Sequence, residues 1–79
     1  MNSYRDYDDA VIEAATRATR DGLDVAIRKC KEYGRIVFNV SYASRNDSDY
    51  ARAEIITPQT APLALAAARS VKARKENAS

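Results

Sequence analysis

The residue types that carry most enzyme chemistry are scarce in this chain of 79 residues. It has no histidine, which removes the commonest general base and the commonest protein ligand of zinc and iron. Its single cysteine, Cys30, has basic neighbours of the kind that activate nucleophilic thiols, but no base partner accompanies it. One cysteine also forms neither an intramolecular disulfide nor a cysteine-based zinc site. We therefore interpret Cys30 as a buried structural thiol.

Two acidic stretches resemble metal sites in composition. Asp6, Asp8 and Asp9 lie close in sequence, but on a helix Asp6 and Asp8 would point about 200° apart. Acids at a helix start complement the helix dipole without any metal. Residues 46–49 have the composition of a calcium loop but lack its spacing and its closing glutamate. Two glycines do not build a phosphate-binding loop. The sequence therefore predicts a protein that is not an enzyme and holds no metal or cofactor.

Five tyrosines are the feature of the composition that most favours binding. Tyrosine combines a large rigid ring with a polar tip and is enriched at protein interfaces. The alternative is that several of these rings cap a small core. Tyr42 and Tyr50 flank a polar stretch rich in turn-forming residues. The predicted protein-binding residues lie in or beside this stretch: Tyr42, Arg45, Asn46, Asp47, Tyr50 and Arg52.

The 13 basic and 11 acidic residues nearly balance, but the basic ones gather in two blocks. Basic residues at helix ends explain both blocks without a ligand. If the blocks meet in the fold, they would instead form one patch suited to phosphates, and the protein would bind nucleic acid. The residues of this alternative site are Arg28, Lys29, Lys31, Arg35, Arg69 and Lys72.

A β-hairpin is predicted at the centre of the chain. Apolar and polar residues alternate over about 35–43, with β-branched and aromatic types enriched, and a second strand follows over about 50–57. One register brings the apolar faces of the two strands together, and it sets Phe38 opposite Ile55. Gly34, just before the first strand, is expected to end a preceding helix.

The N-terminal part, about residues 4–33, has the apolar spacing of a helix. One interpretation is a break near Gly22, with Asp21 capping a second helix. Acids then open each helix and bases close it, which favours the break. The other interpretation is a single helix roughly 46 Å long at 1.5 Å per residue. Such a helix would extend beyond a domain of this size unless another chain packed on it.

A C-terminal helix is predicted over about residues 59–74, because this stretch is rich in alanine, the strongest helix former. The helix begins with either Thr57 or Thr60 as its cap. The apolar stripe along this helix consists of Leu63, Ala67 and Val71.

Together these elements predict an α+β fold in the order α(α)–β–β–α. The hairpin packs against the N-terminal helical segment and the C-terminal helix in one domain of residues 1–79, with a frayed tail at 73–79. Because the chain has 15 alanines, the core is expected to be shallow. A homodimer or another partner chain would help to cover it. No motif carries a resemblance to a family.

The sequence predicts a small protein–protein interaction module that docks on a larger macromolecular partner and modulates or inhibits it. Small inhibitors or accessory proteins of a phage or mobile element have this make-up. A two-stranded hairpin is barely stable alone, and its edges invite pairing with another chain, which favours this function over a nucleic-acid-binding regulator. No apolar run approaches the roughly 18 residues of a membrane span, and the N-terminus lacks the apolar core of a signal peptide, so a cytoplasmic protein is expected.

Overall fold

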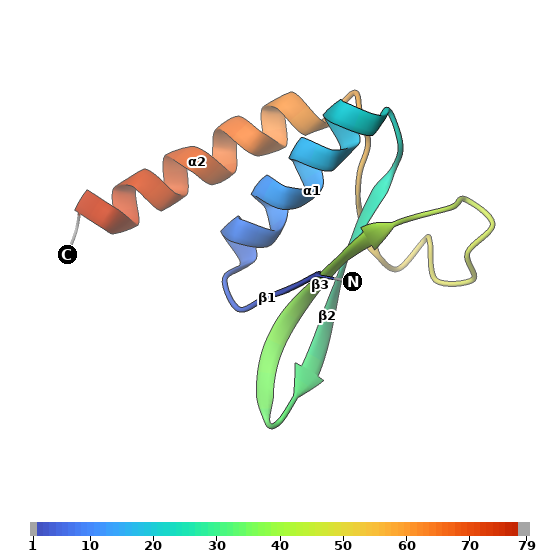
Figure 1. Cartoon of the computed structure of the whole chain (residues 1–79), viewed down its shortest axis with the longest axis horizontal. Helices are drawn as coiled ribbons and strands as arrows, with labels where there is room; N and C mark the ends of the chain where they lie inside the picture. Colours follow the sequence, from blue (N-terminus) through green and yellow to red (C-terminus); the bar gives the residue numbers. More distant parts are fainter. Residues whose placement is uncertain (1, 78–79) are drawn as a thin grey trace.

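Two helices lie on one face of a four-stranded antiparallel sheet in the computed structural model of the chain, which describes residues 2–77 (Figure 1). The elements follow in the order β1 (Asn2–Tyr4), α1 (Tyr7–Asp21), β2 (Val25–Glu32), β3 (Arg35–Tyr42), β4 (Glu54–Ile56) and α2 (Ala61–Asn77). α1 packs on the sheet, and α2 packs mainly on α1. The predicted α+β class and its helix–strand–strand–helix order are confirmed, with β1 before α1 and β2 after it as additions to that order.

α1 has clear local signals at both ends. The Asp6 side chain caps its start and accepts a hydrogen bond from the Asp8 backbone N–H at 2.8 Å. At its end, Gly22 adopts the left-handed conformation with φ 66° and donates to the Ala18 carbonyl at 2.9 Å. The predicted break near Gly22 is therefore confirmed, and the single helix over 4–33 is wrong. The buried stripe of α1 consists of Ala10, Val11, Ala14, Ala15 and Ala18.

The predicted second helix before Gly34 is wrong, because residues 25–32 form the strand β2. β2 pairs with β3 along its whole length, and the pair Glu32–Arg35 closes a two-residue turn. Both turn residues, Tyr33 and Gly34, have positive φ, 50° and 76°, as the tight turns that match strand twist require. Gly34 thus ends a strand rather than a helix. A short isolated helix is marginal in water, whereas this hairpin gains a full ladder of backbone hydrogen bonds.

The predicted pairing of 35–43 with 50–57 is also wrong. β3 lies between β2 and β1, and β4 pairs with the other side of β2, in the sheet order β1-β3-β2-β4. Phe38 is accordingly opposite Lys29 and Tyr4 instead of Ile55. Residues 43–53 form a long loop with several turns, so the chain returns on the far side of β2 instead of folding back on β3.

The core lies between α1 and the helix-side face of the sheet. The strands contribute Val25, Ile27, Val40 and Ile56 to it, and α1 contributes its alanine stripe. β1 and β2 both run antiparallel to β3, so β1, α1 and β2 form a split β–α–β unit with β3 inserted between its strands. Alanine lets the helix approach the sheet closely. The largest fully buried side chains are only Val25 and Val40, so the apolar core is shallow.

α2 is reached through a reciprocal threonine pair. The Thr60 N–H donates to the Thr57 hydroxyl at 3.2 Å, and the Thr57 N–H donates to the Thr60 hydroxyl at 3.1 Å. This is the capping-box pattern with Thr57 as the cap, one of the two predicted starts. α2 then runs to Asn77, past the predicted end at 74, while residues 78 and 79 of the predicted frayed tail lie outside the described residues.

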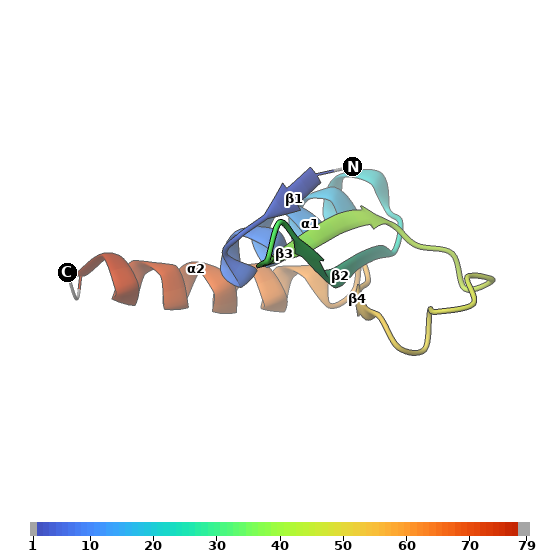
Figure 2. The same ribbon diagram turned by 90° about the horizontal axis from the view of Figure 1, so that it is seen from below.

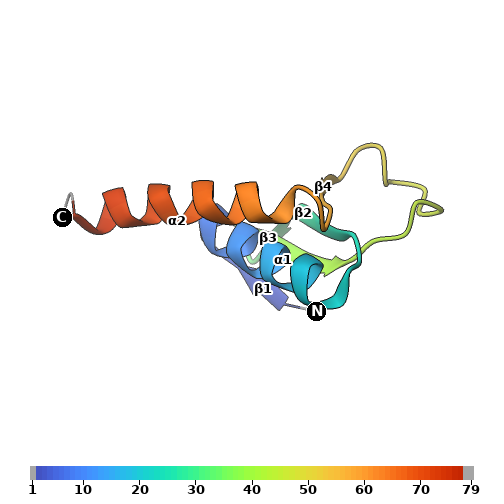
Figure 3. The ribbon, with the colours of Figure 1, turned by 90° about the horizontal axis from the view of Figure 1, so that it is seen from above.

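Much of α2 extends past the rest of the domain, while loop 43–53 projects at the opposite end (Figures 2 and 3). The predicted stripe of α2 is largely exposed, with Leu63 at 78% and Val71 at 39%, and Ala61 and Ala68 are buried instead. α2 is fixed to α1 by ion pairs: Lys72 binds Asp9, and the Lys75 amino group lies 2.9 Å from Asp8. Neither described helix is long and apolar enough to cross a membrane.

The two turn residues between β2 and β3 should respond in opposite directions to substitution. A Cβ at Gly34 would meet no atom within 4 Å, so Gly34→Ala should cost only the strain of its positive φ, about 1–2 kcal/mol. Tyr33→Asn should stabilise the fold by about 0.5–1 kcal/mol, because asparagine tolerates positive φ better than tyrosine. Urea denaturation of the two variants measures both changes. Changes of the same sign would contradict this turn geometry.

Candidate functional site

The sheet has an open edge on its central strand β2. β4 pairs with residues 25–27 only, so within residues 2–77 no strand lies beside residues 28–32, here called the β2 edge. The Ala43 N–H donates to the Asp24 carbonyl at 3.0 Å. Because hydrogen-bonded pairs alternate along an antiparallel ladder, the backbone N–H and C=O groups of the even-numbered residues of β2 point toward β3. The backbone N–H and C=O groups of Lys29 and Lys31 therefore point outward, away from the sheet.

A tight turn keeps β4 from continuing along this edge. The N–H groups of Arg52 and Ala53 both donate to the Asp49 carbonyl at 2.9 Å, so the chain turns away just before Glu54. Glu54 then accepts a hydrogen bond from the Tyr7 hydroxyl of α1. Burial, followed by this carboxylate, raises the pKa of Tyr7 to about 12. The β2 edge is thus open because the local structure of loop 43–53 prevents the loop from covering it.

The side chains at the β2 edge are cationic on the helix side of the sheet. The register sets Lys29 beside Phe38 and Lys31 beside Ile36. Phe38 is covered by the Tyr7 ring, with the centroids 5.4 Å apart in an edge-to-face arrangement. Both lysines are exposed, and no described acidic group lies within ion-pair distance of either. They are free to meet a ligand.

A groove of about 610 Å³ runs beside the β2 edge. Tyr7 and Phe38 line it on the α1 side, and Arg52 and Glu54 line it beside β4. Arg52 is exposed and contacts no acidic group among the described residues, so it adds a third free cation. The groove thus lies next to β2 with aromatic rings at one wall. Its lining also holds the paired Arg28 and Asp49, so Lys29 and Arg52 are its free cations.

On the opposite, open face of the sheet, Arg28 fixes loop 43–53. Its guanidinium donates two hydrogen bonds to Asp49, at 2.6 and 3.0 Å, and one to the Ser41 hydroxyl at 3.0 Å. It also lies 3.7 Å from Asp47. The hydrogen bonds to Asp49 raise the pKa of Arg28 and lower that of Asp49. Cys30 is half-buried on the same face and accepts a hydrogen bond from the Asn39 amide at 3.0 Å.

The predicted protein-binding residues lie together in or next to loop 43–53, but not at a hairpin tip. Several are held by contacts within the chain: the Tyr50 hydroxyl lies 3.0 Å from Asp24, Arg45 lies 4.0 Å from the same carboxylate, and Asp47 accepts from the Ser44 N–H at 2.9 Å. Asn46 and Arg52 are exposed, and Arg52 alone of the six lines the groove.

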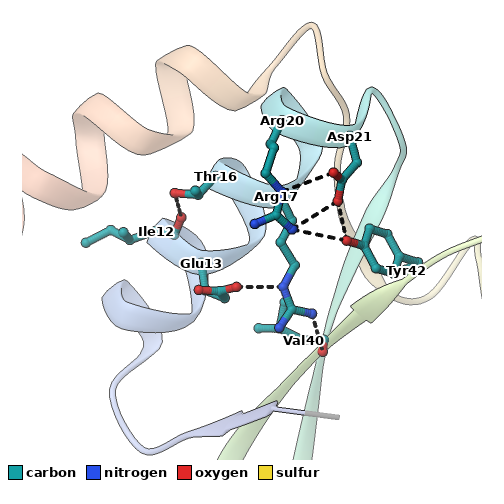
Figure 4. A network of polar contacts seen from close by, with 8 residues as sticks. All are labelled: Ile12, Glu13, Thr16, Arg17, Arg20, Asp21, Val40 and Tyr42. Carbon is teal, nitrogen blue, oxygen red and sulfur yellow. Dashed lines mark hydrogen bonds and ion pairs between the residues drawn. The ribbon is translucent and has the colours of Figure 1, made fainter.

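Tyr42 belongs to a network that joins α1 to the end of β3 (Figure 4). Its hydroxyl donates to Asp21, and Asp21 also accepts two hydrogen bonds from Arg20, at 3.0 and 3.1 Å. The Arg17 guanidinium lies 5.9 Å above the Tyr42 ring and donates to the Val40 carbonyl at 3.5 Å. This network fixes the helix on the sheet, so the role of Tyr42 within the chain is structural.

The predicted nucleic-acid-binding residues divide between two places. Lys29, Lys31 and Arg35 lie on the far half of the β2–β3 hairpin, whereas Arg69 and Lys72 lie on α2, which points in another direction (Figure 1). Lys72 is paired with Asp9, and Arg28 is paired with Asp49 on the open face of the sheet. The two basic blocks therefore do not form one patch, and the exposed cations that lie together are those of the hairpin.

Sequence reasoning missed the edge itself, because residues 25–32 have the charge pattern of a helix. The signal that could have revealed it is the alternation of Val25 and Ile27 before a Tyr33–Gly34 turn. No protein-family model, curated protein or solved structure matches the chain. The β2 edge, its groove and its free cations are therefore the features from which a function is argued.

The Asp21 network should make the stability of the fold depend on pH in the acid range. Hydrogen bonds from Arg20 and then Tyr42 lower the pKa of Asp21 to about 2. A carboxyl with a lowered folded-state pKa stabilises the fold above its unfolded pKa of about 4, and this contribution is lost as pH falls toward 2. Asp21→Asn should therefore be less stable than the wild type at neutral pH and lose less stability between about pH 4 and 2. Urea denaturation across this range tests it, with Glu32→Gln as the control. Parallel profiles for Asp21→Asn and wild type would contradict the network.

Proposed function

We propose that this protein is a non-enzymatic protein–protein interaction module that docks on a larger macromolecular partner through its β2 edge and modulates or blocks that partner. The observation that carries this function is the pair of outward backbones at Lys29 and Lys31, on a strand with no neighbour at 28–32. An extended segment of another protein can add to such an edge and gain main-chain hydrogen bonds, while side chains on alternate residues supply specificity.

The rigidity of β2 supports this function. β2 is paired with β3 along its whole length, and its first part, residues 25–27, is buried under α1, so its edge is ordered before a partner arrives. Pre-ordering lowers the entropic cost of association. The far half of the hairpin also extends away from both helices, which leaves room for an incoming strand (Figure 1).

Site-specific photo-crosslinking in the cells that produce the protein tests this function. A photoreactive residue in place of Lys31 should crosslink to a discrete protein, whereas the same residue in place of Arg69, which is exposed on α2, should not. Treatment with nuclease should leave the crosslinked product unchanged. Equal crosslinking from both positions, or no protein product from Lys31, would contradict docking at the β2 edge.

Nucleic-acid binding is the second candidate, and the free charge of the hairpin favours it. Lys29, Lys31 and Arg35 are all exposed without an acidic partner among the described residues, and the Tyr33 ring is fully exposed at the turn, where it could stack on a base. Titration with single-stranded and duplex DNA at rising salt decides this function. A steep fall of affinity with salt would promote it over protein binding, and no binding at low salt would end it.

A further inference from the structure

The β2 edge carries its charge in a specific pattern. Lys29 and Lys31, whose backbones point outward, also place their side chains on the same face of the sheet, because they are two residues apart. The residue between them, Cys30, faces the other side. Any strand that adds to this edge therefore meets a lysine at every second position on the helix side.

A second copy of the chain is a poor occupant of this edge. The backbone N–H and C=O groups that point outward belong to the odd-numbered residues of β2. If two β2 edges paired, odd-numbered residues of one copy would therefore lie opposite odd-numbered residues of the other. In an antiparallel pair centred on Cys30, Lys29 of one copy would lie opposite Lys31 of the other, and this like-charge contact would occur twice by symmetry. Lysines at an open edge thus oppose the self-association that open edges invite.

The same charges favour a partner strand with carboxylates. Opposite charges directly across an antiparallel pair are favourable. The nearby acids of this chain leave the lysines free, since Glu54 is bound to Tyr7 and Glu32 lies on the other face of the sheet. Arg52, at the rim of the groove, adds to the positive potential there. The groove beside the edge is lined on the α1 side by Tyr7 and Phe38, which can pack against the stems of acidic side chains.

We infer that the β2 edge takes an extended segment of a partner protein with acidic side chains on alternate residues, so that two carboxylates lie opposite Lys29 and Lys31. This inference rests on the proposed function and names the chemistry of its partner. The hydrogen bonds of strand addition supply the geometry, and the two ion pairs select the acidic strand over neutral and basic ones.

The test is titration of the ¹⁵N-labelled protein at low salt with two short probe peptides, one of alternating threonine and glutamate and one of alternating threonine and lysine. The glutamate peptide should bind about tenfold more tightly than the lysine peptide. It should also slow hydrogen exchange at the Lys29 and Lys31 amides. The double variant Lys29→Glu/Lys31→Glu should reverse the preference, and circular dichroism checks that this variant is folded, as the exposure of both positions leads us to expect.

The outcomes separate the inference from the function on which it rests. Equal or tighter binding of the lysine peptide, with protection of the two amides, would overturn the acidic partner and leave strand addition standing. Binding of the glutamate peptide without amide protection, or binding of neither peptide, would overturn both. A short thymidine oligonucleotide that displaces the glutamate peptide and binds more tightly to the same lysines would overturn the inference in favour of nucleic acid.

Discussion

Replacing Val40 with alanine should lower the free energy of unfolding by about 2–3 kcal/mol. Val40 is fully buried in β3, opposite Ile27, and faces the alanine stripe of α1. Removing two methyl groups loses their transfer free energy and leaves a cavity that small neighbouring side chains are poorly able to fill. A domain of 79 residues has roughly 4–12 kcal/mol of stability in total, so the loss is a large share of it.

Thermal unfolding followed by circular dichroism measures this effect, and the melting temperature should fall by roughly 10–20 °C. Val71→Ala is the matched control, because it removes the same atoms from a side chain that is 39% exposed on α2. It should change stability by about 0.5 kcal/mol or less. Similar losses for Val40→Ala and Val71→Ala would contradict a core centred between α1 and the sheet.

Lys31→Pro should strongly weaken binding at the β2 edge while leaving the protein folded. Proline removes the outward N–H of Lys31 and places its ring where a partner strand would lie, and edge positions with an outward N–H are those that tolerate proline. Binding of the glutamate probe peptide should weaken at least about tenfold, the effect of losing a main-chain hydrogen bond and gaining a steric clash. Lys31→Ala, which removes the charge alone, should weaken binding by only about threefold.

A proline one residue earlier provides the control for this experiment. The Cys30 N–H points toward β3, so Cys30→Pro breaks the ladder between the two longest strands and should destabilise the protein by about 2 kcal/mol or more. A stable Cys30→Pro together with an unfolded Lys31→Pro would reverse the assigned direction of the β2 backbone. A folded Lys31→Pro that still binds the peptide would contradict strand addition at this edge.

Local sequence signals correctly predicted the elements that are determined by their own residues, such as α1 and β3. Acids opening and bases closing each segment indicated a helix break near Gly22, and Gly22 is where α1 ends. Alternation marked β3, whose even-numbered residues Phe38 and Val40 face the helices as the pattern indicates. In each of these cases the residue types that form the element also determine which side is buried.

The elements that were missed depend on partners distant in sequence. The charge spacing of Asp24 and Arg28 suggests a helical ion pair, but Arg28 binds Asp49, 21 residues away. Tyrosine is uncommon at positive φ, so the residue type at position 33 did not indicate the turn that joins β2 to β3. Lys29 and Lys31 were recognised as basic residues, yet their position at an open edge follows only from which strands lie beside β2.

Hydrogen exchange at single amides of β2 in the free protein tests the central claim, the open edge, most directly. The Arg28 and Cys30 N–H groups point toward β3 and should be protected, whereas those of Lys29 and Lys31 point to solvent and should exchange at least about tenfold faster. Such alternation is the result that an open, ordered edge predicts. Equal protection of all four amides would show that the edge is already covered, and equal rapid exchange would show that β2 is not a stable strand there.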